Sequence, residues 1–98
     1  MEDFKSKLKC EELDYFFEAI RALKTGEECY RFFEDILTVT EIKALSQRLQ
    51  VAKMLKEKKT YVEIADLTGA STATISRVNR ALTYGCDGYN LILDRLKK

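Results

Sequence analysis

Residues 61–80, YVEIADLTGASTATISRVNR, decide how this chain folds. The stretch predicts two short helices joined by a tight turn, which is the form of a helix-turn-helix. Gly69 stands where the turn needs a positive φ, and other residues adopt that conformation only at an energetic cost. Ala65 is small where the two helices must cross closely. Apolar positions at helical spacing predict the buried faces of both helices: Ile64, Leu67, Ile75 and Val78.

Helix-start signals extend this interpretation along the chain. Thr60 with Glu63 forms a capping box for the first helix of the pair, and Ser71 is the N-cap of the second. Two earlier Thr-x-x-Glu boxes stand at residues 25–28 and 38–41. Each box predicts the start of a further helix.

The periodicity predicts an all-α fold of six helices in one domain of 98 residues. Proline is absent, glycine occurs four times, and the β-branched residues show no sustained alternation. Outside the motif, we expect a first helix from about Asp3 to Lys24, a second after Thr25, a third from Thr38 to about Lys58, and a short closing helix near 89–96.

The composition argues against catalysis and against export. The chain has no histidine, so the commonest general base and the commonest metal ligand are both missing. Cys10, Cys29 and Cys86 form no CxxC pair, which favours reduced thiols over a disulfide framework or a zinc site. The first residues, MEDFKSKLK, contain no apolar signal segment, and the uncharged run 67–76 is too polar and too short to cross a bilayer. We expect a soluble, cytoplasmic protein with no enzymatic activity, no metal, no cofactor and no membrane partner.

The net charge of +1 conceals an uneven distribution. Residues 1–41 carry six basic and eleven acidic side chains, whereas residues 42–83 carry eight basic and three acidic ones. Regions of opposite sign indicate a basic face toward a polyanion. The basic run KEKK at 56–59 is as consistent with contact to backbone phosphates as with a solvated helix end.

Aromatic residues concentrate in the N-terminal part of the chain. Seven of the ten lie before residue 41: Phe4, Tyr15, Phe16, Phe17, Tyr30, Phe32 and Phe33. Two short helices cannot easily bury this many rings against each other, although an ordinary core is the simpler explanation of an aromatic stripe. The excess favours a homodimer in which a second chain completes the core.

Helical geometry places a set of small and basic residues on the outer side of the second motif helix. With Ile75, Val78 and Leu82 turned inward, the residues on or near the exposed side are Thr72, Ala73, Ser76 and Arg80. The position of this helix and the basic charge together indicate binding to double-stranded DNA. A packed helical corner with no DNA partner is the alternative.

The stretch 37–82, LTVTEIKALSQRLQVAKMLKEKKTYVEIADLTGASTATISRVNRAL, resembles the DNA-binding half of the tryptophan repressor family, with a single one-residue gap before the motif. Leu-Thr-x-x-Glu at 37–41 and Ala-Leu-x-x-Arg at 44–48 carry the resemblance beyond generic helix-turn-helix positions. The chain as a whole looks most like the YerC/YecD-type branch of these repressor-like proteins.

The resemblance implies an intertwined homodimer with a recognition helix in the major groove. Residues 1–37 would supply the dimerisation helices, 38–83 the DNA-binding region with the motif at 61–80, and 84–98 a C-terminal helix that completes the dimer core. Thr72, Ala73, Thr74 and Ser76 would face the operator, where small hydroxyl side chains suit water-bridged base contacts of the kind that the tryptophan repressor makes. The whole set expected at the DNA is Lys58, Lys59, Thr60, Tyr61, Thr72, Ala73, Thr74, Ser76, Arg77 and Arg80.

Three positions depart from the family pattern. Val62 stands where the tryptophan repressor has an arginine that touches guanine, so the same operator is not expected. Thr38, Arg48 and Arg77 match residues that would cradle an amino-acid effector. However, Val78 replaces a glycine over the ligand ring and Ala81 replaces a serine near its amino group. We therefore do not expect L-tryptophan as corepressor; another small effector or none remains open, and the two arginines fit a structural role paired with acids or phosphates better.

Together these features predict a homodimeric, sequence-specific regulator of transcription, most simply a repressor. The alternative is a helical protein-interaction module that keeps the fold without specific DNA binding. A nonspecific DNA coat protein fits less well, because the overall charge is nearly neutral.

Overall fold

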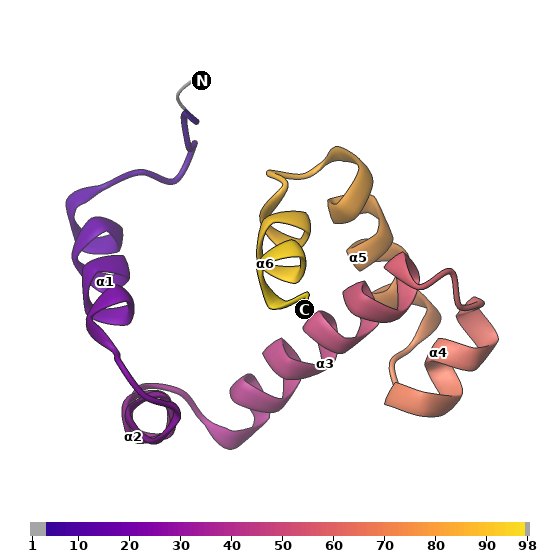
Figure 1. Ribbon diagram of the computed structural model, residues 1–98, viewed down its shortest axis with the longest axis horizontal. Helices are drawn as coiled ribbons and strands as arrows, with labels where there is room; N and C mark the ends of the chain where they lie inside the picture. The colour runs from indigo at the N-terminus through magenta and orange to yellow at the C-terminus, as the bar shows by residue number, and fades with distance from the viewer. Residues whose placement is uncertain (1–3, 98) are drawn as a thin grey trace. The chain divides into compact units, whose positions relative to one another are not determined.

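A computed structural model describes residues 4–97 of the chain. The described residues form α-helices and connecting segments, with no strand among them. Contacts divide the chain into two compact units, an N-terminal unit (residues 1–37) and a C-terminal unit (residues 38–98). The helices, labelled in Figure 1, are α1 (Glu11–Ala22), α2 (Gly26–Ile36), α3 (Val39–Lys56), α4 (Tyr61–Thr68), α5 (Thr72–Tyr84) and α6 (Gly88–Leu96). The all-α prediction is confirmed.

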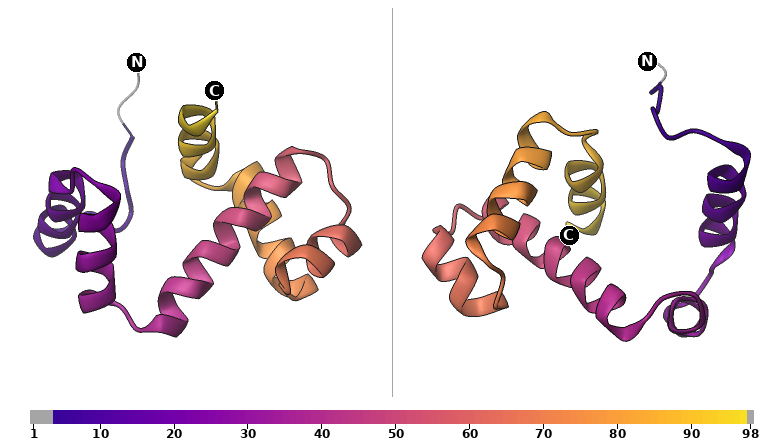
Figure 2. Two further views of the ribbon diagram at one scale, coloured as in Figure 1. Left: turned by 60° about the horizontal axis from the view of Figure 1, so that its bottom comes forward. Right: turned by 180° about the vertical axis from the view of Figure 1, so that it is seen from behind.

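The core of the C-terminal unit lies where α3, α4 and α5 pack together. Both views of Figure 2 show α4 and α5 against the C-terminal half of α3, and α6 contacts α3 and α5. The fully buried residues are Val51, Ala52, Ile64, Ala70, Ile75 and Val78. Three of the four apolar positions predicted from the motif therefore lie inside.

Leu67 is the exception, and the prediction of its burial is wrong. Its side chain is 63% exposed. Ile64 and Ala70, on either side of it in the sequence, belong to the buried core, whereas Leu67 does not. Leu67 instead lines an open groove between α3 and α4.

The turn between α4 and α5 has the predicted chemistry. Gly69 has φ +74° and ψ 5°, and its N–H donates to the Ala65 carbonyl at 2.8 Å, which ends α4. The Thr68 hydroxyl donates to the Ile64 carbonyl at 2.7 Å and accepts from the Ala70 N–H at 3.1 Å. Both sides of the turn are thus hydrogen-bonded, and the direction of α5 relative to α4 is fixed.

The four helix starts predicted from capping residues are confirmed. At the start of α2 the Thr25 hydroxyl accepts from the Glu28 N–H at 3.1 Å, but the Glu28 carboxylate accepts from the Lys24 N–H at 2.8 Å, so this box is not reciprocal. Thr38 with Glu41 and Thr60 with Glu63 form reciprocal capping boxes, with both bonds of each box at 2.9–3.1 Å. The Ser71 hydroxyl accepts from the N–H of Thr74 at 3.1 Å. These caps satisfy N–H groups that the first turn of a helix cannot pair internally.

The first helix is shorter than predicted. It begins at Glu11 rather than near Asp3, a residue that lies outside the described part of the chain. Three acidic residues fill the first turn of α1, whereas the preceding segment 5–9 carries three lysines. Acidic side chains stabilise the positive N-terminal end of a helix and basic ones do not, so the helix starts where the charge changes sign.

The N-terminal unit has rings in contact but no buried residue in either helix. The Phe16 ring lies 5.7 Å from Phe17 and 6.3 Å from Phe32, and Phe32 lies 5.2 Å from Phe33. Tyr15 and other large apolar side chains of the unit are more than half exposed. The unit therefore displays the apolar surface of a core that its own two helices do not close.

We predict that Glu63→Gln makes the free energy of unfolding depend less on pH in the acid range. The Thr60 backbone N–H, and then its hydroxyl, hold the pKa of Glu63 below its ordinary value of 4.5. With a lowered folded-state pKa, this carboxylate stabilises the fold above its ordinary pKa and loses that effect as the pH falls through the lowered value. Glutamine accepts the same hydrogen bond but does not titrate in this range.

Urea midpoints measured from neutral pH down to about pH 3 test this prediction. The wild type should lose more stability than the variant over this range. Asp66→Asn is the matched control, because Asp66 lies on the same helix and no side-chain hydrogen bond is found for it in residues 4–97. Parallel profiles for Glu63→Gln and wild type would contradict the role of the box.

Candidate nucleic-acid interface

The recognition-helix candidate, α5, presents one buried and one exposed face. Ile75 and Val78 lie in the core, and Leu82 packs against it. The predicted DNA-facing residues that are exposed on α5 are Thr72, Ala73, Ser76, Arg77 and Arg80. The core packing therefore orients the opposite side of α5 toward solvent, as helical periodicity predicts.

Thr74 is less available than its neighbours. Its side chain is half-buried, and its hydroxyl accepts a hydrogen bond from the Ser71 hydroxyl at 3.1 Å. The Thr74 N–H is also bonded within this cap. Thr74 thus shapes the start of α5 more than it extends the exposed surface.

The exposed face of α5 is free of negative charge. No aspartate or glutamate occurs between Leu67 and Cys86. The ion pairs found among residues 4–97 join Lys9 to Asp14, Arg31 to Glu27 and Lys53 to Glu57.

Neither Arg77 nor Arg80 takes part in these ion pairs, and the same is true of Arg48. The pairing of Arg48 and Arg77 with acids, which the sequence favoured, is thus not seen within the described chain. The guanidinium groups of α5 are available to an anion from outside.

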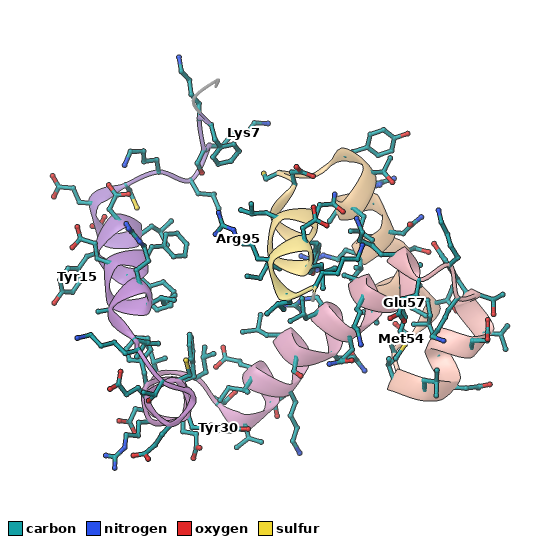
Figure 3. All side chains as sticks on the ribbon, in the orientation of Figure 1. Lys7, Tyr15, Tyr30, Met54, Glu57 and Arg95 are labelled. Atoms are coloured by element: carbon teal, nitrogen blue, oxygen red, sulfur yellow. The ribbon has the colours of Figure 1, made fainter. Side chains whose placement is uncertain are left out.

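Lys58 occupies an unusual backbone position after α3. Its φ is 68°, in the left-handed region that favours glycine. The Lys58 N–H donates to the Leu55 carbonyl at 3.0 Å, and the Lys59 N–H donates to the Met54 carbonyl at 3.1 Å. These are the paired hydrogen bonds of a Schellman motif. Met54 and Glu57 mark this end of α3 in Figure 3. The motif turns the chain sharply between α3 and α4.

The other predicted contacts near this turn are partly engaged. The Thr60 hydroxyl accepts from Glu63 in the capping box, although the residue itself is exposed. The Tyr61 ring packs against the core. Lys59 is half-buried, and Lys58 is exposed. Lys58 is therefore the exposed cation of this turn.

One chain alone does not bring the predicted effector residues together. Thr38 is the N-cap of α3, and its hydroxyl accepts from the Glu41 N–H. Arg48 lies ten residues further along the same axis, which places the two backbones roughly 15 Å apart. A small ligand that touches both would need Thr38 from a second copy.

Val78 also bears on the effector site. It is 1% exposed and forms part of the core. Its isopropyl group therefore fills space that a glycine would leave open. Within the C-terminal unit, the Val78 side chain leaves no space for an aromatic ligand ring at this position.

A groove between α3 and α4 was not predicted from the sequence. Its volume is about 480 Å³, and its lining residues are Lys43, Ser46, Gln47, Gln50, Met54, Leu67 and Thr68. None of the three predicted effector residues lines it. Its signal in the sequence was Leu67, an apolar residue at a spacing that also fits burial.

Residues 4–97 offer neither a metal cluster nor a membrane-spanning helix. Side chains of His, Cys, Asp and Glu form no group of three that could hold a metal ion there. No described helix is both long and apolar enough to cross a membrane.

Sequence and structure comparisons agree on one family. The Trp repressor protein family model matches residues 11–97. The uncharacterized protein YerC of Bacillus subtilis (strain 168) is 58% identical over 92 residues, which are 94% of this chain and 88% of YerC.

Two solved structures are similar over nearly the whole chain. A candidate Trp repressor from Staphylococcus aureus has a TM-score of 0.89 and 58% identity, over 92% of this chain and 90% of that one. A TrpR-like protein from Eubacterium eligens ATCC 27750 has the same score and identity, over 92% of this chain and 93% of that one. With six helices and a helix-turn-helix in its described residues, the chain belongs to the Trp repressor family of DNA-binding regulators.

Proposed function

We propose that this chain is a homodimeric, sequence-specific repressor that places α5 in the major groove of double-stranded DNA. The observation that carries the proposal is the exposed face of α5, which is fixed from behind by the core and carries two arginines and no acid. A rigid helix with a positive, uncovered face suits a groove bordered by phosphates.

The proposed contacts divide into two kinds. Thr72, Ala73 and Ser76 would meet base edges, with Thr74 at the margin. Arg77, Arg80 and the turn at Lys58, Lys59, Thr60 and Tyr61 would meet phosphates and fix the register. Small side chains near the bases allow close approach of the helix, so sequence preference would depend on shape and bridging water as much as on direct bonds.

Dimerisation supports this function and completes the fold. Neither helix of the N-terminal unit buries a residue, and Leu91, Ile92 and Leu96 of α6 are exposed. A second copy would cover these surfaces. A twofold dimer also doubles the base contacts, with half-sites about one helical turn of DNA apart.

Selection of bound duplexes from a random pool tests the proposal. We expect enrichment of a sequence with two symmetric half-sites. A pool that stays random while binding persists would instead indicate a nonspecific DNA protein. Absence of binding to any duplex would favour a protein-interaction module, for which the exposed Val62 and Leu67 of α4 offer an apolar surface.

We predict that two substitutions on α5 act differently on binding to the selected duplex. Ala73→Asp places a carboxylate against the groove and should weaken binding on the order of tenfold or more. Arg80→Ala should reduce the slope of log affinity against log salt by roughly 0.9 per lost phosphate contact, or about 1.8 per dimer.

Lys43→Ala is the control for the salt dependence, because it removes the same charge from the α3–α4 groove, outside the proposed interface. Circular dichroism should show unchanged helix content for all three variants. An Arg80→Ala slope equal to that of wild type would exclude this phosphate contact.

Lys58→Gly is predicted to stabilise the protein and weaken DNA binding at once. Glycine relieves the left-handed backbone at φ 68°, which is worth about 1 kcal/mol in the free energy of unfolding. The same change removes the cation proposed to hold a phosphate. Urea unfolding and salt-dependent titration of duplex DNA measure the two effects.

Lys58→Ala is the matched control, because it removes the charge but keeps a side chain in the strained position. It should weaken binding as much as Lys58→Gly without the gain in stability. If Lys58→Gly binds DNA as tightly as wild type, Lys58 makes no phosphate contact.

L-tryptophan is predicted not to bind. Val78 fills the core where the family pattern has a glycine, and Ala81 offers no hydroxyl. Calorimetric titration of the dimer should give only heats of dilution, and the amino acid should leave the DNA affinity unchanged. A clear isotherm at micromolar tryptophan would contradict this prediction.

A further inference from the structure

Tyr84 is the last residue of α5, and its large side chain is exposed. Its side chain is 83% exposed. Together with Ala73, Arg77 and Arg80 it stands at spacings of four, three and four residues, which form a single stripe along one side of a helix. Tyr84 therefore continues the surface proposed to meet DNA.

The phenol of Tyr84 is unused in the structure. No hydrogen bond to its hydroxyl is found among the bonds of residues 4–97, whereas the neighbouring Thr83 hydroxyl donates to the Asn79 carbonyl at 3.1 Å. Gly85, the next residue, has no side chain that could cover the Tyr84 hydroxyl. A Cβ at Gly85 would lie 2.5 Å from the Ala81 carbonyl oxygen, so this position accepts no side chain.

In the proposed complex, helix geometry would bring Tyr84 to the edge of the major groove. Tyr84 lies eleven positions after Ala73, a rise of roughly 16 Å along the axis. The major groove is about 12 Å wide, so a helix that reads bases through its first turns brings its last residue to a phosphate strand.

The carbonyl end of a helix carries partial negative charge and repels a phosphate. A contact at this end of α5 therefore needs a donor on a side chain that extends away from the axis. A tyrosine hydroxyl is such a donor, and it is among the groups that bind phosphates in protein–DNA complexes.

We propose that Tyr84 donates its hydroxyl to a DNA backbone phosphate where α5 leaves the major groove. This inference rests on the proposed DNA-binding function and adds a neutral contact to the cationic ones. The contact fixes how far α5 enters the groove, because the rigid ring sets the distance between the helix end and the phosphate strand.

Tyr84→Phe tests the hydroxyl alone, with the selected duplex as probe. We expect affinity to fall about tenfold for each lost hydroxyl contact, or about a hundredfold for the dimer, in the range for loss of a hydrogen bond to a charged group. Because no charge is removed, the slope of log affinity against log salt should stay at the wild-type value, unlike that of Arg80→Ala. Thr83→Val is the matched control, since it deletes an adjacent hydroxyl that is already bonded within the helix, and its affinity should not change.

Tyr84→Arg provides the opposite test. A cation at the same position should raise the affinity and steepen the salt slope by roughly 0.9 per contact. Sedimentation of each variant reports whether the oligomeric state has changed.

Three outcomes would overturn the inference. Wild-type affinity for Tyr84→Phe together with an unchanged slope for Tyr84→Arg would show that no phosphate lies near this residue. A loss of affinity that accompanies a change in sedimentation would assign Tyr84 to a subunit contact. Failure of the wild type to bind any duplex would overturn the proposed function as well, whereas the first two outcomes leave it standing.

Discussion

The packing of α4 and α5 against α3 is the constraint on which the C-terminal unit depends. Ile64, Ile75, Val51 and Val78 are the largest fully buried side chains, and they come from all three helices. Truncation of one such residue to alanine typically costs about 2–5 kcal/mol, a large share of the roughly 5–15 kcal/mol that stabilises a small domain. The same contacts hold the outer face of α5 in place. Stability of the core and orientation of the proposed DNA surface therefore cannot be changed independently.

The two units differ in how much apolar surface each buries within one chain. The C-terminal unit buries an apolar core within one chain, and the hydrogen bonds of its turn and caps are made locally. The N-terminal unit has ring contacts with centroid distances of 5.2–6.3 Å but no buried residue in its helices. Burial of apolar area is the main favourable term in folding, so this unit needs apolar surface from outside its own two helices. In the proposed dimer, assembly and folding of residues 4–37 would be one event.

Local signals in the sequence predicted most of the fold. Capping residues, the turn glycine and the 3.6-residue period depend on neighbours within a few positions, and the structure places Thr38, Thr60, Ser71 and Gly69 in the predicted roles. The wrong predictions concern features that depend on a contact with another helix or on the electrostatics of a helix end. Leu67 fits a buried stripe on α4, but whether it is buried depends on how α3 crosses. The late start of α1 follows from the balance of lysines and acids around the helix end, which apolar periodicity ignores.

The charges of the proposed DNA surface were likewise only partly predictable from local sequence. The sequence located the basic region, but exposure and pairing of each cation depend on tertiary contacts. Arg77 and Arg80 stay clear of acids because the 20 residues from Leu67 to Cys86 contain none, and a local count of charges would have found this. The left-handed backbone of Lys58 could not be inferred, because glycine is the residue usually expected there. Glycine would relieve the backbone at this position, and the proposed function gives the lysine side chain a role, because DNA bound to α5 would be a polyanion for this cation.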